Sequence, residues 1–196
     1  MQYEWLRHLS SDATNTVIGL ARTAAPVESK LAADKITTVH VLEADMINPA
    51  SLNTAAADVT ELTNGSIDYL IVNGAFSDPN TQNLLPTAFI GREGVLRKDM
   101  ITSLEVNVLG VMHSINAFLP LIRKSYVKKI IVISTGLADT ENVPKTGNPS
   151  FVTYSSMKAA LNMVVAKYSV ELKEEGIIVL ALSSGIVTTR ETPAYA

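Results

Sequence analysis

The chain has 196 residues, of which 47% are hydrophobic and 18% charged, and its formal net charge is −3. This length can bury one sizeable core, so we expect a single domain over residues 1–196. Lysine and arginine form no cluster, which disfavours nucleic-acid or anionic-membrane partners. The absence of cysteine excludes disulfides, thiolate catalysis and cysteine-based zinc sites. We expect a soluble, cytoplasmic protein without a metal.

Short β-branched runs alternate with longer segments of helical period, which is the pattern of βαβ units and a parallel sheet covered on both faces. Two irregular stretches rich in proline and glycine, Phe76–Arg97 and Thr135–Val152, are expected to be loops. In chain order the pattern predicts a helix at Glu4–Leu9, a strand at Thr16–Leu20, a helix at Pro26–Ala33, a strand at Val39–Ala44, a helix at Pro49–Leu62, a strand at Tyr69–Val72, a helix at Lys98–Arg123, a strand at Lys129–Ser134, a helix at Thr153–Glu174 and a strand at Ile177–Leu182.

Small or polar residues follow every predicted strand. Ligands of open parallel sheets bind at the carboxyl ends of the strands, so these positions predict one ligand-binding edge. Any single position is as well explained by the polarity of loops, and only the combination indicates a site. The positions are Arg22, Asp45, Asn73-Gly74-Ala75, Thr135-Gly136 and Ser184–Thr189.

Tyr154 and Lys158 are four residues apart at the start of a predicted helix, which places both side chains on one helical face. A tyrosine with an ordinary pKa of about 10 needs a shift of roughly 3 units to act as an acid or base near neutral pH. A nearby ammonium supplies part of that shift. The pattern alone is weak, and its alternative is an amphipathic helix with a solvated lysine.

Several stretches together resemble the short-chain dehydrogenase/reductase family, in the family's order and over nearly the whole chain. The resemblance implies an α/β, Rossmann-like, doubly wound parallel sheet that binds a nicotinamide cofactor. The stretches are Val17–Arg22, Leu42–Asp45, Asp68–Asn73, Asn107 with Gly110, Ile133–Gly136, Tyr154–Asn162 and Gly185–Thr189.

The resemblance implies roles for four catalytic residues. Tyr154 would be the general acid or base, and Lys158 would lower its pKa and hydrogen-bond the nicotinamide ribose. Asn107 would hold a water that connects the lysine to solvent. Thr135 would orient the substrate carbonyl; Ser134 is the alternative, and we favour Thr135 because side chains alternate along a strand.

The resemblance also implies cofactor contacts at the strand ends. Arg22 favours the 2′-phosphate of NADP over NAD, since a basic residue grips a phosphate where an acid would bind the ribose diol. Asp45 would lie beside the adenine, with a loop or capping role as its alternative. Asn73, Gly74 and Ala75 replace the family's Asn-Ala-Gly, and Val187 and Thr189 would approach the nicotinamide carboxamide.

The family's first strand and Thr-Gly-x-x-x-Gly-x-Gly turn do not occur in this sequence, nor does a C-terminal lid. We expect the missing strand to lie centrally, so that its absence leaves two inner edges unpaired or forces them together. An incomplete reading of the gene, a truncated paralogue, or a strand exchanged within an oligomer would each explain this, and we favour the first.

The predicted function is hydride transfer between NADP(H) and a ketone or secondary alcohol, with a small-molecule substrate and a homo-oligomer formed through the helices at Lys98–Arg123 and after Tyr154. The stretch Ile133–Ala138 is similar to carbonyl reductase-like and ketoreductase-like members. The alternatives are a non-catalytic interaction or regulatory protein, and a sugar-nucleotide epimerase of the extended family.

Overall fold

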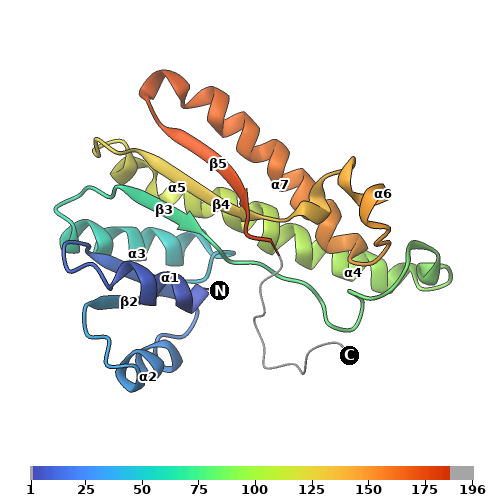
Figure 1. Ribbon diagram of the computed structural model, residues 1–196, viewed down its shortest axis with the longest axis horizontal. Helices are drawn as coiled ribbons and strands as arrows, with labels where there is room; N and C mark the ends of the chain where they lie inside the picture. The colour runs from blue at the N-terminus through green and yellow to red at the C-terminus, as the bar shows by residue number, and fades with distance from the viewer. Residues whose placement is uncertain (1, 186–196) are drawn as a thin grey trace.

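The computed structural model describes residues 2–185 and contains two parallel sheets of unequal size (Figure 1). The smaller sheet pairs β1 (Val17–Ala21) with β2 (Val39–Glu43). The larger sheet has the order β3-β4-β5. Its strands are β3 (Tyr69–Val72), β4 (Lys129–Ser134) and β5 (Ile178–Ser183). All three strand pairs are parallel, as the βαβ pattern predicts.

The helices lie between the strands along the chain. They are α1 (Gln2–Leu9), α2 (Ala25–Ala33), α3 (Pro49–Leu62), α4 (Glu93–Leu104), α5 (Gly110–Ile122), α6 (Asn142–Thr146) and α7 (Val152–Glu171). A π-helical segment at Glu105–Leu109 joins α4 to α5 without a break. Short 3-10 turns occur at Pro86–Phe89, Gly136–Ala138 and Lys173–Glu175.

The predicted elements are all present: the bounds predicted for α3, β3 and β4 are confirmed, and those of the other elements shift by one to a few residues. The predicted strands at Thr16–Leu20 and Ile177–Leu182 each lie one residue further along, and the one at Val39–Ala44 ends one residue earlier. The predicted helix at Lys98–Arg123 begins earlier, at Glu93, whose carboxylate accepts the backbone N–H of Gly91 (2.9 Å). Both predicted loops contain short helical turns, because tertiary contacts order stretches that have no periodic pattern.

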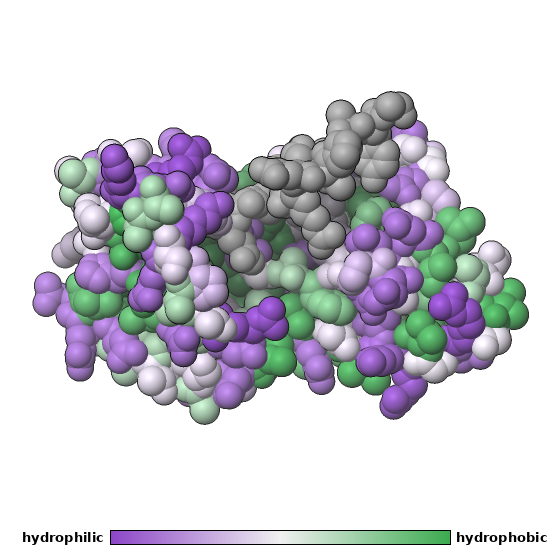
Figure 2. Space-filling model, turned by 90° about the horizontal axis from the view of Figure 1, so that it is seen from below, coloured by the Kyte–Doolittle hydropathy of each residue, from purple (hydrophilic) through white to green (hydrophobic). Residues whose placement is uncertain are grey.

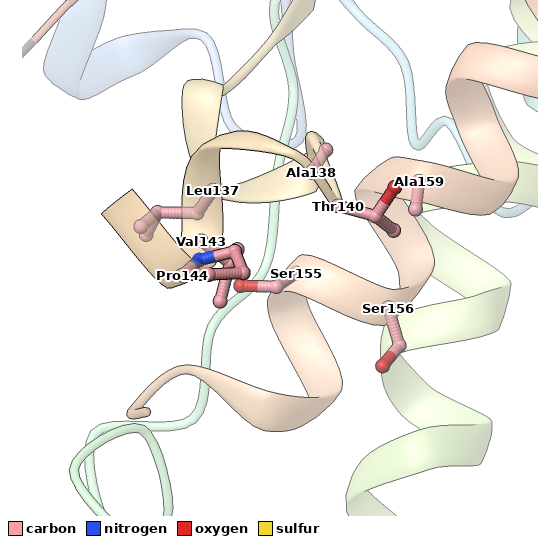
Figure 3. A pocket seen from close by; sticks show the side chains of 8 residues that line it. All are labelled: Leu137, Ala138, Thr140, Val143, Pro144, Ser155, Ser156 and Ala159. Atoms are coloured by element: carbon pink, nitrogen blue, oxygen red, sulfur yellow. The ribbon is translucent and has the colours of Figure 1, made fainter. Parts of the chain in front are cut away.

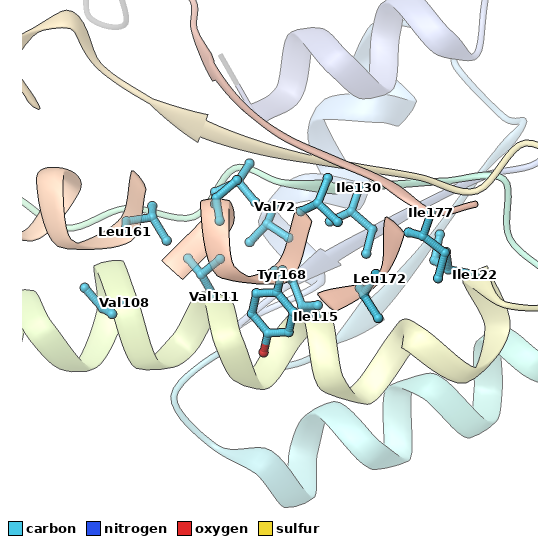
Figure 4. Close-up of a cluster of buried hydrophobic side chains, with 13 residues drawn as sticks. Val72, Val108, Val111, Ile115, Ile122, Ile130, Leu161, Tyr168, Leu172 and Ile177 are labelled. Atoms are coloured by element: carbon cyan, nitrogen blue, oxygen red, sulfur yellow. The ribbon is translucent and has the colours of Figure 1, made fainter. Parts of the chain in front are cut away.

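The main core lies between the larger sheet and the helices α5 and α7, which cover the same face of that sheet (Figure 4). Alternate residues of the strands point into this layer, as a parallel sheet requires. The fully buried members include Val111 and Ile115 on α5, Ile130 and Val132 on β4, and Leu161 on α7. This packing holds the start of α7 beside the end of β4.

A second apolar cluster ties the smaller sheet to the rest of the molecule. Leu52, Ala55 and Val59 of α3 pack against Phe118 and Leu121 of α5. Partly buried Ile18 and Leu42, from β1 and β2, join the same cluster. On the other face of β1, a Cβ added to Gly19 would lie 3.0 Å from the side chain of Leu6, so α1 covers that face closely.

The predicted parallel α/β, Rossmann-like fold is confirmed, and within the described residues its strands form two sheets. No hydrogen-bonded ladder between residues 2 and 185 links β1 to β3, so the inner edges are unpaired, the first of the two outcomes expected. Packing of α3 on α5 connects the two parts instead. In Figure 2 a hollow with hydrophobic surface separates the left part of the molecule from the right.

The helical run Glu93–Ile122 is long and apolar enough to cross a membrane, with a mean hydropathy of 1.3 over its most apolar window. Just over half of that window, 56%, is buried inside the protein. Its buried residues pack against the larger sheet and α7. The homo-oligomer expected through this run and α7 stays a prediction.

Candidate active site

The side chains of Tyr154 and Lys158 lie one above the other in the first turns of α7. Lys158 Nζ is 5.9 Å from the centroid of the Tyr154 ring. The lysine is 1% exposed and donates a hydrogen bond to the carbonyl oxygen of Ile133 in β4 (2.7 Å). Its side chain therefore joins α7 to the end of the strand, which rules out the solvated lysine of the alternative interpretation.

Burial moves the pKa of both groups away from their ordinary values. Desolvation lowers the pKa of Lys158 to about 8, because its ammonium lies in an apolar interior and hydrogen-bonds a neutral carbonyl group. Burial also raises the pKa of Tyr154. The pKa of Tyr154 was expected to fall, and in the protein without cofactor it rises because burial disfavours the phenolate. At neutral pH the phenol keeps its proton.

The two hydroxyls at the end of β4 face different surroundings. Ser134 is buried and donates to Oδ1 of Asn162 on α7 (2.6 Å). Thr135 is half-buried, and its Oγ1 accepts the backbone N–H of Leu137 (3.2 Å). The Thr135 hydroxyl keeps its own proton to donate, whereas that of Ser134 is committed to Asn162. This arrangement favours Thr135 as the substrate-orienting residue.

Asn107 lies in the π-helical segment and is fully buried. Its Oδ1 accepts the backbone N–H of Phe76 (2.9 Å), and its Nδ2 donates to the Phe76 carbonyl (2.8 Å). A π turn adds one residue to the helix, and such turns are frequent at functional sites. The side chain therefore anchors the segment after β3, and its predicted holding of a water stays a prediction.

Met46, which follows Asp45, explains the altered Asn73-Gly74-Ala75 motif. A Cβ added to Gly74 would lie 2.5 Å from Met46 Sδ, and one added to Gly110 would lie 3.0 Å from Met46 Cγ. The thioether thus fills the space between the two glycines. Sequence reasoning did not foresee this contact; the displaced glycine at position 74 was its only trace.

The remaining predicted cofactor residues lie at the ends of the smaller sheet and β3. Arg22 is exposed directly after β1, and Ala75 is exposed beyond β3. Asp45 closes a turn, accepting the backbone N–H of Ile47 (3.2 Å), while Asn48 caps α3. Val187 and Thr189 lie outside the described residues.

Glu43 is a strand-end residue that sequence reasoning missed. Its carboxylate accepts the backbone N–H of Ala24 (3.0 Å), which holds the short turn that contains Arg22. Its signal in the sequence was faint, because a charged residue at the end of a strand is common. The contact appears only when β1 and β2 are paired, which places Ala21 opposite Glu43.

A cavity of about 330 Å³ lies between α6 and the solvent-facing side of α7 (Figure 3). Its lining is mostly apolar, with hydroxyls from Thr140, Ser155 and Ser156. Tyr154 does not line it, because the phenol and the two serines point from different sides of the helix. The cavity is thus lined by neighbours of Tyr154 and Lys158 and not by these two residues themselves.

Known protein families and relatives identify the family of this chain. The family model of the short chain dehydrogenases matches residues 4–195. The chain belongs to the short-chain dehydrogenase family. Relatives include a short-chain dehydrogenase/reductase, AacuF, of Aspergillus aculeatus, which is 44% identical over 191 residues covering 97% of this chain and 71% of the relative. Another, atnB of an Arthrinium species, is 39% identical with coverages of 97% and 71%.

Solved structures show the same fold. A short-chain dehydrogenase from Streptomyces avermitilis superposes with a TM-score of 0.75 at 23% identity, over 97% of this chain and 65% of that one. An NADPH-bound carbonyl reductase from chicken fatty liver gives a TM-score of 0.73 at 26% identity, over 91% and 72%. This dehydrogenase chain therefore spans 65% to 72% of the lengths of these relatives.

The residues of this short-chain dehydrogenase fit a nicotinamide cofactor at its two ends. The ammonium of Lys158 uses one N–H in its hydrogen bond to Ile133 and lies beside the Tyr154 ring. Its other N–H groups can donate to a ribose hydroxyl. Arg22 is exposed and forms no ion pair among residues 2–185. Lys158 and Arg22 are thus the residues that would hold the nicotinamide ribose and the adenosine of such a cofactor.

Replacing Gly74 by alanine should destabilise the protein by about 1 to 3 kcal/mol, since the new Cβ overlaps the thioether of Met46. Adding Met46→Val should recover part of the loss, because valine does not reach position 74. Urea unfolding of both variants and of Met46→Val alone measures the coupling. Equal stability of Gly74→Ala and the wild type would contradict the proposed overlap.

Replacing Lys158 by methionine should remove a pH dependence of stability. Because folding lowers the pKa of this lysine to about 8 from an ordinary 10.5, the unfolded chain binds more protons between these values. The free energy of unfolding should therefore gain up to about 3 kcal/mol as the pH rises through that window. The variant should lack this gain, and Lys167→Met, at an exposed position on α7, should keep it. Urea unfolding between pH 7.5 and 10.5 makes the comparison; identical slopes in all three proteins would contradict it.

Proposed function

We propose that this protein is an NADP(H)-dependent oxidoreductase that transfers hydride between the nicotinamide and a ketone or secondary alcohol. The observation that carries the proposal is the pairing of Tyr154 and Lys158 at the end of β4 in a member of the short-chain dehydrogenase family. The non-catalytic alternative finds no support, because Tyr154 and Lys158 lie together and the relatives carry the names of dehydrogenases and reductases.

The raised pKa of Tyr154 suits the direction of carbonyl reduction. When bound, the nicotinamide supplies the hydride that adds to the carbonyl carbon. Tyr154 Oη donates its proton to the carbonyl oxygen, which completes the alcohol. The Thr135 hydroxyl donates a hydrogen bond to the same oxygen and holds it near the phenol. The ammonium of Lys158 stabilises the phenolate that remains.

The preference for NADP rests on Arg22. A guanidinium can bind the 2′-phosphate with two parallel hydrogen bonds, and nothing among residues 2–185 pairs with it as an ion partner. Glu43 holds the backbone of the same turn and so keeps the arginine at the strand end. The NADPH-bound carbonyl reductase of chicken liver, which shares this fold, is consistent with this choice.

A ketone is the proposed substrate class because the phenol of Tyr154 has a proton to give to a carbonyl oxygen and the hydroxyl of Thr135 at the end of β4 can donate to the same atom. Two structures of the same fold are named as carbonyl reductases, one from chicken and one, provisionally, from Caenorhabditis elegans. The acid chemistry of Tyr154 matches reduction of such a carbonyl.

Replacing Tyr154 by phenylalanine should lower kcat/KM for ketone reduction by about 10²- to 10⁴-fold, because the proton donor is lost while the ring remains. The measurement is NADPH oxidation with a panel of aliphatic and aromatic ketones. Tyr168→Phe is the matched control: it lies on the same helix and hydrogen-bonds Asn116, so its activity should stay within about twofold of wild type. Full activity of Tyr154→Phe would overturn the assignment.

Replacing Arg22 by alanine should reduce the preference for NADPH over NADH by about 10- to 100-fold, the loss expected for charge-assisted hydrogen bonds to a phosphate. Calorimetric binding of 2′,5′-ADP against 5′-AMP tests the same contact without turnover. Arg92→Ala, at an exposed position before α4, serves as the control. If Arg22→Ala leaves the ratio of NADPH to NADH activity unchanged, other residues select the cofactor and the proposal is contradicted.

A further inference from the structure

A buried carboxyl group lies behind the catalytic helix, outside the site described above. Asp99, on α4, is 3% exposed. Its Oδ2 accepts hydrogen bonds from the hydroxyls of Thr81 (2.6 Å) and Thr153 (2.7 Å), and its Oδ1 accepts one from Ser103 (3.3 Å). Among residues 2–185 it has no ion pair. Hydrogen bonds from three hydroxyl groups thus take the place of water around this carboxyl group.

The partners of Asp99 come from three different parts of the chain. Ser103 is on the same helix one turn later, so its bond is local. Thr81 belongs to the segment that follows β3, and Thr153 immediately precedes Tyr154 in the first turn of α7. All three hydroxyl-bearing residues are buried, at 0% to 4% exposure. The carboxyl group therefore connects the segment after β3 to the residue next to the catalytic tyrosine.

The first residues of α7 have no side-chain cap. The N-cap residue of this helix, Phe151, has a left-handed backbone conformation. The N–H of Phe151 donates to the carbonyl oxygen of Gln82 (2.7 Å), which again joins the helix to the segment after β3. A first turn without a capping side chain frays readily. Two side-chain contacts then lie next to Tyr154: the edge-on contact of its ring with that of Phe151, whose centroids are 6.4 Å apart, and the Thr153 bond to Asp99.

The segment after β3 is itself held at both ends. Asn107 binds both backbone groups of Phe76, and Asp99 holds the hydroxyl of Thr81. Both anchors sit on the continuous helical run through α4 and the π-helical segment. This run serves as a common frame from which the strand end and the catalytic turn are both positioned.

We propose that Asp99 is a positioning residue that sets the Tyr154 phenol relative to the strand ends, acting through the hydroxyl of Thr153. The role in the reaction rests on the proposed function above. An error of about 1 Å in a proton donor can cost roughly 100-fold in rate. Loss of the Thr153 bond should therefore lower kcat and change KM much less.

The decisive variants are Thr153→Val and Thr153→Ser. Valine has nearly the shape of threonine but no hydroxyl, and serine keeps the hydroxyl, so the pair separates the hydrogen bond from packing. Asp99→Asn tests the acceptor at constant size. Asp58→Asn, at an exposed position on α3, is the control for loss of one negative charge.

The first measurement is the ¹³Cζ NMR signal of tyrosine in the protein without cofactor, with Tyr154 assigned from the Tyr154→Phe spectrum. Thr153→Val and Asp99→Asn should shift or broaden the Tyr154 signal and leave that of Tyr168, further along α7, in place. Thr153→Ser and Asp58→Asn should reproduce the wild-type spectrum. An unmoved Tyr154 signal, or an equal change in both tyrosines, overturns the proposal, because the network would then serve only the stability of the helix.

The second measurement is steady-state ketone reduction. Thr153→Val should lower kcat by about tenfold or more with KM changed less than about twofold, and Thr153→Ser should restore kcat. A rise in KM at constant kcat contradicts a role in positioning the phenol. If the wild-type protein reduces no ketone, the proposed function fails, and the NMR comparison still decides whether Asp99 positions Tyr154.

Discussion

The hydrogen bond from Lys158 Nζ to the carbonyl oxygen of Ile133 is the contact on which the rest of the site depends. It carries a cation into a layer of apolar side chains and ties the first turns of α7 to the end of β4. Desolvation opposes this placement, which is why the pKa of the lysine falls to about 8. Leu161 and Val165, further along the same face of α7, supply the packing that offsets the cost.

Around this contact the chain uses polar side chains to hold backbone segments that have no regular structure. Asn107 satisfies both backbone groups of Phe76, and Glu43 satisfies the N–H of Ala24. Each is a charged or amide group placed where a strand-end turn would otherwise leave buried or half-buried polar atoms unpaired. The strand-end edge is thus ordered before any ligand arrives, as a preorganised site requires.

The two sheets show how helix packing can stand in for strand pairing. β1 and β2 have no ladder to β3 within the described residues, yet Ile18 and Leu42 join the cluster under α3 and α5. The family's structures superpose on this arrangement, with a TM-score of 0.75 for the Streptomyces avermitilis protein. Burial of apolar area is not directional, so it keeps the two parts in a family-like arrangement without the backbone bonds that would fix their register.

The sequence by itself determined the family and the parallel α/β class, and it predicted that Tyr154 and Lys158 lie together. Period-two and period-3.6 patterns are local, and a spacing of four puts Tyr154 and Lys158 on one helical face wherever the helix lies. The motif Asn73-Gly74-Ala75 was visible as a departure from the family pattern, but its cause was not, because Met46 is distant in sequence and meets Gly74 only after folding.

Only the tertiary structure decided the electrostatics and the long-range contacts. Whether Lys158 is solvated or buried, and hence the direction of its pKa shift, depends on the layer between β4, α5 and α7. The role of Asn107 depends on a π turn, and the hydrophobic periodicity of the sequence gives no signal for such a turn. The hydroxyls gathered by Asp99 come from positions up to 54 residues away, and a polar residue in a sequence carries no mark of the partner it will find.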